Sequence, residues 1–170
     1  MAASCVLVLS ACTWGVPLKD INVTIEADPK AKFSGYKTYT WLGSTAILND
    51  AEGLWEPPGF DADAHVKYLI DRELRNRGME ENRNDPDMGV AFALGVDMDA
   101  LGLKTDPKTK MAAMKNVPKG ALVVALVDTE TGFVIWMGTA TAEVQKDIDE
   151  EAIKKRLDFA VTRMFWRMPE

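Results

Sequence analysis

The sequence predicts an α+β domain, a two-layer sandwich in which two helices cover one face of a mixed, mostly antiparallel sheet of about five strands. Strand and helix patterns do not alternate regularly along the chain, but follow the order two strands, helix, strand, hairpin, helix. Two segments, which begin at Asp61 and Asp147, repeat apolar residues at helical spacing. Segments 121–127 and 133–144 are apolar runs joined by a five-residue turn, which is typical of an antiparallel hairpin.

The composition is that of one folded domain. The chain has 170 residues, of which 47% are hydrophobic, and a net charge of −6. At roughly 100–200 residues per domain, this length indicates a single compact unit. Ordinary apolar content and five Trp residues exclude disorder for most of the chain. The acidic balance argues against nucleic acid as a partner, and beyond the first residues no segment approaches the roughly 20 apolar residues of a membrane-spanning helix.

The first two strands are predicted near the N-terminus. Residues 21–27 (INVTIEA) alternate apolar and polar side chains, and Asp28-Pro29 ends this strand because Pro cannot continue a ladder in the middle of a sheet. Residues 36–42 (YKTYTWL) are aromatic and β-branched, as in a strand. Residues 43–59 carry Gly, Asn-Asp and Pro-Pro, so we expect a long loop there.

The clearest helix covers residues 61–77. Asp61 or Asp63 is suited to accept from the free N–H groups at its start, and Gly78 stands where a left-handed terminator is expected. One face of this helix is apolar and is made by Ala62, Val66, Leu69, Ile70 and Leu74.

The second half of the chain completes the sheet and adds the last helix. Residues 89–98 (GVAFALGVDM) predict a buried strand, whereas Gly, Pro and Lys residues in 101–118 indicate a solvated crossover with a helical turn at 111–114. The last helix is expected to start at Asp147, with Glu150 completing a capping box. Its apolar face is predicted to contain Ile153, Leu157, Ala160, Val161, Met164, Phe165 and Met168.

The N-terminus resembles a lipoprotein signal. Residues 1–11 are apolar or small, too short to span a membrane and typical of a signal peptide. Leu9-Ser10-Ala11-Cys12 resembles the lipobox of bacterial lipoproteins, in which a peptidase cuts before the Cys, the thiol carries diacylglycerol and the new amine carries an acyl chain such as palmitate. The expected organisation is therefore a signal peptide (1–11), a lipidated tether (12–20) and one domain (21–170). The alternative is an apolar strand of a cytoplasmic protein with an incidental Cys12.

The resemblance to a lipobox implies where in the cell the protein is located. A membrane is the expected partner, through a lipid anchor at Cys12, and the several acyl chains would hold the protein stably because each buried methylene contributes about 0.8 kcal/mol. The residue after Cys12 is Thr13 rather than Asp, which in lipoproteins of enteric bacteria favours the outer membrane. The resemblance thus implies an outer-membrane anchor with the domain facing the periplasm.

Four segments of the mature chain resemble one protein family. They are 33–41 (FSGYKTYTW), 70–78 (IDRELRNRG), 85–92 (DPDMGVAF) and 120–140 (GALVVALVDTETGFVIWMGTA). In order and spacing they resemble the bacterial envelope lipoproteins grouped as domain-of-unknown-function family 4136. The resemblance implies an α+β domain tethered to the envelope, with no assigned activity and no catalytic residues to carry over.

No constellation of residues predicts catalysis or a bound cofactor. His65 is the single His and has no companion ligands for zinc, so we expect an exposed, solvated side chain. Neither a nucleophile-elbow motif nor a phosphate-binding loop occurs. Asp85-Pro86-Asp87 and Asp97-Met98-Asp99 lack the distal Glu of a calcium loop and are interpreted as turn residues. We therefore expect no catalytic residue, no metal and no cofactor.

Three classes of function remain open. The preferred class is a non-enzymatic binding or accessory module that presents an apolar patch to an envelope protein, with Trp55, Phe60 and Trp166 as candidate contact residues. For Trp55 and Trp166 the alternative is ordinary packing onto the domain. A binder of a small apolar or amphipathic ligand would need a pocket of roughly 300 Å³ or more. A hydrolase, the least favoured class, would need two acids with opposed pKa shifts in one cleft.

Overall fold

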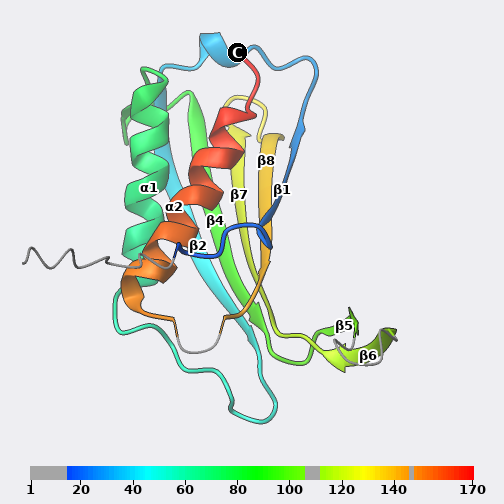
Figure 1. Cartoon of the computed structure of the whole chain (residues 1–170). Coiled ribbons are helices and arrows are strands. Elements are labelled where there is room, and N and C mark those ends of the chain that lie inside the picture. Colours follow the sequence, from blue (N-terminus) through cyan, green and yellow to red (C-terminus); the bar gives the residue numbers. More distant parts are fainter. Residues whose placement is uncertain (1–14, 106–111, 146–147) are drawn as a thin grey trace, which may run out of the picture.

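The domain is a six-stranded sheet with two helices packed on one face (Figure 1). The computed structural model describes residues 15–105, 112–145 and 148–170. The helical segments are α1 (Ala62–Asn76), α2 (Glu150–Trp166) and the single turn η1 (Phe33–Gly35). The strands are β1 (Asn22–Ala27), β2 (Thr38–Asn49), β3 (Glu80–Glu81), β4 (Met88–Asp97), β5 (Leu101–Thr105), β6 (Ala112–Asn116), β7 (Lys119–Asp128) and β8 (Val134–Glu143).

The predicted fold class is confirmed, with a difference in the sheet. Its strand order is β1-β8-β7-β4-β2-β3. The pairs β1–β8, β8–β7 and β7–β4 are antiparallel, whereas β4–β2 and β2–β3 are parallel. The sheet is therefore mixed rather than mostly antiparallel, and it has six strands rather than about five. The parallel pairs arise because α1 returns the chain to the end of the sheet where β2 began.

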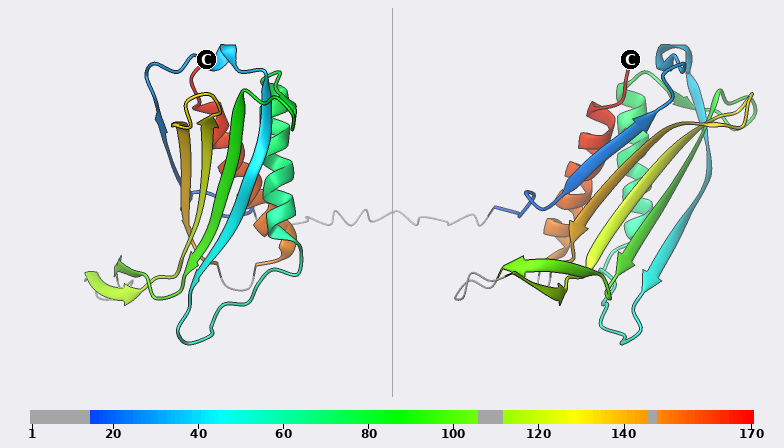
Figure 2. Two further views of the ribbon diagram at one scale, coloured as in Figure 1. Left: turned by 180° about the vertical axis from the view of Figure 1, so that it is seen from behind. Right: turned by 90° about the vertical axis from the view of Figure 1, so that its right-hand side faces the viewer.

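The core lies between the helices and the sheet. Alternate residues of β7 (Leu122, Val124 and Leu126) point toward the helices and are buried. On the helix side, Leu69, Ile70, Val161, Met164 and Phe165 meet them. The opposite face of the sheet carries no helix, as the two views of Figure 2 show. No helix in the described part of the chain is long and apolar enough to cross a membrane.

The helix boundaries follow the predicted signals, with one correction. Asp61 is the N-cap of α1 and accepts from the Ala64 N–H at 2.9 Å, while Gly78 has φ +77°. The cap of α2 is Asp149, which accepts from the Ala152 N–H at 2.7 Å. The predicted start at Asp147 is therefore wrong, and Glu150 is the first helical residue rather than the reciprocal member of a capping box. Asp147 itself lies outside the described residues.

Two segments predicted as irregular are strands. The expected loop at 43–59 begins only after Asn49, because β2 pairs with β4 from Tyr39 to Asn49, with one irregularity between Trp41 and Gly43. Residues 101–105 and 112–116 of the expected crossover form a two-stranded hairpin, with Leu103 opposite Met114. The helical turn predicted at 111–114 is wrong for 112–114, which belong to β6, and Met111 lies outside the described residues.

Candidate functional site: an apolar cavity beside helix α2

An apolar cavity of about 600 Å³ lies between the sheet and the first half of α2. Its floor is formed by the adjoining ends of β4, β7 and β8, and its roof by α2. The segment from Leu54 to Ala62 closes one side, and another side is open to solvent. The lining is mostly apolar and includes Ile21, Trp55, Leu94, Met98, Leu122, Ala140, Ile153 and Ala160.

Small residues on the strands make room for the cavity. Gly120 of β7 and Ala140 and Ala142 of β8 line it, and all three lie on the face of the sheet that the helices cover. Helix α2 crosses the sheet obliquely (Figure 1). Because α2 meets small side chains at this end, the two layers do not fill the space between them.

The loop after β2 supplies a wall. Asp50 accepts hydrogen bonds from the N–H groups of Leu54 (2.9 Å) and Trp55 (2.7 Å), and these bonds lower the pKa of the Asp50 carboxyl. The turn so formed directs the half-buried Trp55 into the lining of the cavity. Trp55 thus packs against the domain at the edge of the cavity.

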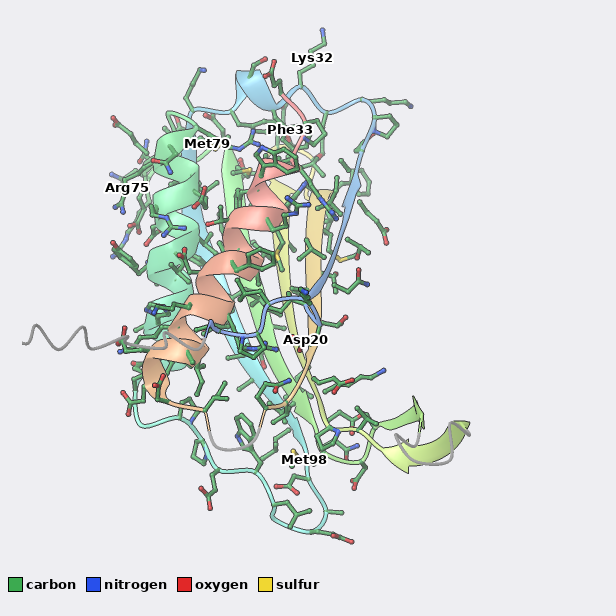
Figure 3. The ribbon with its side chains drawn as sticks, in the orientation of Figure 1. Asp20, Lys32, Phe33, Arg75, Met79 and Met98 are labelled. Atoms are coloured by element: carbon green, nitrogen blue, oxygen red, sulfur yellow. The ribbon has the colours of Figure 1, made fainter. Side chains whose placement is uncertain are left out.

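Arg156 joins the cavity to the segment that enters the domain. Its guanidinium donates to both Asp20 carboxylate oxygens, at 3.0 and 2.6 Å, to the Glu143 carbonyl at 3.3 Å and to the Pro17 carbonyl. The hydrogen bond from Arg156 is the main cause of the lowered pKa of Asp20. Figure 3 shows Asp20 on the stretch of chain beside α2. The described part of the predicted tether, 15–20, is therefore attached to the cavity wall.

Phe60 and His65 lie next to each other, close to the segment that walls the cavity. Phe60 is half-buried, its ring centroid is 5.7 Å from that of His65, and Lys154 lies 5.0 Å above it. His65 is half-buried between Phe60 and Tyr68, and its Nε2 has no hydrogen-bond partner among the described residues. The expectation of an exposed, solvated His65 is wrong, because these two aromatic rings shield it. Nowhere in the described ranges do three or more metal-ligating side chains gather.

Trp166 lies at the other end of α2. It is 71% exposed and its ring lies 4.8 Å from the Arg163 guanidinium. The three candidate contact residues therefore do not form one patch: Trp55 and Phe60 lie near the N-terminal end of α2, and Trp166 at its C-terminal end. Cys12 lies outside the described residues.

Other polar side chains connect elements of the fold. Asp71 of α1 accepts from the Tyr39 hydroxyl (2.8 Å) and the Trp41 Nε1–H (3.0 Å) of β2, an arrangement that sequence reasoning missed. Burial and then Asp71 raise the pKa of Tyr39. The sequence signal was the pair of aromatic residues on alternate positions of β2, together with an acid that directly follows Ile70 of the apolar helix face.

The motif residues at the opposite end of the sheet also have structural partners. Asp87 accepts from the N–H groups of Lys37 and Thr38, both at 2.8 Å, and Asp128 accepts from the Tyr36 hydroxyl at 2.7 Å. These bonds lower the pKa of Asp87 and contribute to the lowered pKa of Asp128. Within the described ranges, the carboxyls with a shifted pKa are Asp20, Asp50, Asp87 and Asp128, and each is lowered.

Comparison with solved structures identifies relatives of the fold. A DUF4136 family protein from Bacteroides thetaiotaomicron is similar over 87% of this chain and 95% of its own, with a TM-score of 0.55 and 11% identity. A PDZ domain protein from Parabacteroides distasonis matches over 89% of this chain with a TM-score of 0.50 and 12% identity, and the chain spans 36% of that protein's length. At these identities the likeness shows the fold alone.

No curated protein matches the sequence. A family model matches residues 23–169, which is most of the chain and all of the described core. Its description is "Domain of unknown function (DUF4136)". The match spans every strand of the main sheet except the first residue of β1, and both helices. This chain therefore belongs to the DUF4136 family.

Proposed function

We propose that this protein is a lipid-anchored, non-enzymatic binding module of the bacterial envelope, and that the cavity beside α2 holds a small apolar or amphipathic ligand. The cavity is the observation that carries the proposal. Its volume of about 600 Å³ lies within the range of roughly 300–1,000 Å³ typical of ligand sites, and its mostly apolar lining favours a hydrocarbon chain or ring.

The charges around the cavity favour binding over hydrolysis. Hydrolysis by carboxyls requires one acid with a raised pKa beside one that stays ionised. Arg156, the one cation among the described lining residues, is already paired with Asp20. Asp20, which binds Arg156 of the cavity wall, is a carboxyl with a shifted pKa, and the shift is downward. The described lining also includes Glu56, Glu143 and Glu150, but the carboxyl with a shifted pKa at this site is held in its ionised form by Arg156, which suits binding better than hydrolysis.

The location of the site fits a membrane-derived ligand. The chain reaches the domain at Pro17 and Asp20, both bound to Arg156 of the cavity wall. Cys12, the proposed lipidated residue, precedes Pro17 by five positions. At no more than about 3.6 Å per residue, those five positions would keep the cavity within roughly 20 Å of the anchor. A lipid-anchored domain would thus present its cavity close to the bilayer surface.

A fluorescent apolar probe tests the proposed binding. We expect N-phenyl-1-naphthylamine to bind the full chain saturably with one site, and Ala142→Phe, which fills the cavity from β8, to weaken binding at least tenfold. Ala93→Phe is the matched control, because Ala93 lies on β4 and points to the opposite face of the sheet. No saturable binding, or equal binding by the two variants, would contradict the proposal.

A further inference from the structure

The outer edge of β2 is open over most of its length. β3 pairs with β2 only at Thr38 and Tyr39, and among the described residues no strand pairs with residues 40–49 on that side. The edge is also exposed at its side chains: Leu42, Ile47 and Leu48 are 57%, 61% and 58% exposed. An open strand edge presents unpaired N–H and C=O groups that another strand can bind.

The chemistry of this edge is unusual for an unprotected strand. Residues 38–49 (TYTWLGSTAILN) contain no Asp, Glu, Lys, Arg or Pro. Soluble proteins normally protect open edges with charges, with Pro or with very short strands. Residues 40–49 pair with no described strand on this side and have none of these protections. We therefore infer that another strand covers this edge in the functional protein.

The register with β4 fixes which side chains share a face. Gly43, Thr45 and Ile47 pair with Ala91, Ala93 and Gly95 and lie on the face without helices. Ser44 lies on the helix face, where its hydroxyl donates to Asp63 of α1 at 3.0 Å. Residues 43–47 are therefore a regular strand that follows the irregularity after Trp41.

We propose that a second copy of this chain pairs with this edge, β2 against β2 in antiparallel orientation, with Thr45 on the two-fold axis. In this register Ile47 of each copy lies opposite Gly43 of the other, where the missing side chain leaves room for it and Leu42 flanks it. Thr45 lies close to the midpoint of the free edge. The pairing would join the two sheets into one of twelve strands.

Charge favours a second copy as the occupant. The chain carries a net charge of −6, so two copies repel each other over most of their surface. The segment 38–49 is neutral, and two identical neutral strands meet without a like-charge pair. A two-fold interface needs such a self-complementary surface. The other edge strand, β1, carries Glu26 and is followed by Asp28.

Sedimentation equilibrium and disulfide cross-linking test the pairing. The full chain carrying Cys12→Ala, under reducing conditions, is expected to sediment as a dimer at twice the 18.8 kDa of one chain. Ile47→Lys places two cations beside the axis and is expected to weaken the dimer at least tenfold. Thr24→Lys, on the exposed part of edge strand β1, is the control and is expected to remain dimeric.

Disulfide cross-linking tests the same pairing without relying on whether the Ile47→Lys variant folds. Opposed Cα atoms of antiparallel strands lie about 4.5–5.5 Å apart, within the range of a disulfide. Thr45→Cys, in a chain with Cys5→Ser and Cys12→Ala, is expected to form a dimer on mild oxidation, whereas Thr24→Cys is not. A monomer of the Cys12→Ala chain at all concentrations, a dimer that Ile47→Lys leaves intact, or equal cross-linking of the two Cys variants would overturn the proposal.

Discussion

Gly138 of β8 lies beneath α2, next to the side chains of Trp136 and Met164. A Cβ added at this position would stand 2.6 Å from Cη2 of Trp136 and 3.0 Å from Sδ of Met164. Both side chains are buried, and the Trp136 ring lies 5.1 Å from that of Phe165, so neither can move without disturbing the core. The glycine is therefore required because the side chains of Trp136, from the same strand, and Met164, from α2, occupy the space of a Cβ, rather than by an unusual backbone conformation.

Gly138→Ala is expected to lower the free energy of unfolding by about 2 kcal/mol, the typical effect of overpacking a filled core. Gly95→Ala is the matched control, because the nearest atom to its added Cβ is 3.6 Å away, an ordinary contact. Urea unfolding of both variants measures the difference. A smaller loss for Gly138→Ala than for Gly95→Ala would contradict this interpretation of Gly138.

Because of Tyr36, we expect the free energy of unfolding to depend on pH in the alkaline range. Burial, and then the hydrogen bond to Asp128, raise the pKa of Tyr36 to about 12. An unfolded Tyr has a pKa of about 10, so the folded state favours the protonated hydroxyl. Its contribution to stability is complete below pH 10 and is lost as the pH rises from 10 to 12.

Tyr36→Phe is accordingly expected to cost about 1 kcal/mol at pH 8, the usual worth of one hydrogen bond. The difference between wild type and variant should shrink toward zero at pH 12. Because Tyr39 is present in both proteins, its own raised pKa cancels in the comparison. Urea titrations at pH 8 and pH 11.5 measure the change, and a difference independent of pH would count against the assigned cause.

At the scale of elements, Asp71 fixes α1 to β2. Its Oδ1 accepts from both Tyr39 and Trp41, and Lys67 lies 3.4 Å from its other oxygen. Asp71→Ala leaves a buried hydroxyl and an indole N–H without an acceptor, and we expect a loss of about 2–3 kcal/mol. Asp63→Ala removes only the exposed bond from Ser44 and should cost at most about 1 kcal/mol.

Thermal or urea unfolding of the two variants separates these effects, and Asp71→Asn, which keeps an acceptor oxygen, should recover part of the loss. Equal stability of Asp71→Ala and Asp63→Ala would show that the Asp71 contacts do not hold the two elements together.

The elements with strong local signals were predictable from the sequence. Asp61 and Gly78 mark the ends of α1 because capping and the left-handed terminator depend on neighbouring residues alone. The continuation of β2 to Asn49 was missed, since Gly43 and Ser44 favour a loop locally and only the pairing with β4 keeps them extended. The β5–β6 hairpin was missed because the segment 101–118 that contains it has one Gly, two Pro and four Lys, which favour a loop locally.

At the scale of the whole molecule, the cavity was beyond reach of the sequence. Its lining extends from Ile21 to Ala160, and the space results from the angle between α2 and the sheet rather than from a motif. The short side chains that leave room for it, such as Gly120, Ala140 and Ala142, each have an ordinary explanation within a strand. The hydrophobic pattern predicts which faces are buried, but it does not predict where two buried faces fail to meet.

The proposed position of the domain in the cell rests on lipidation of Cys12, and one measurement tests this directly. The intact mass of the protein extracted from its own membrane, under denaturing conditions, is expected to equal residues Cys12–Glu170 plus one diacylglycerol and one acyl chain. A Cys12→Ala variant should lack the lipid mass and leave the membrane fraction. An unprocessed chain with a free Cys12 thiol would contradict the proposal of a lipid-anchored binding module.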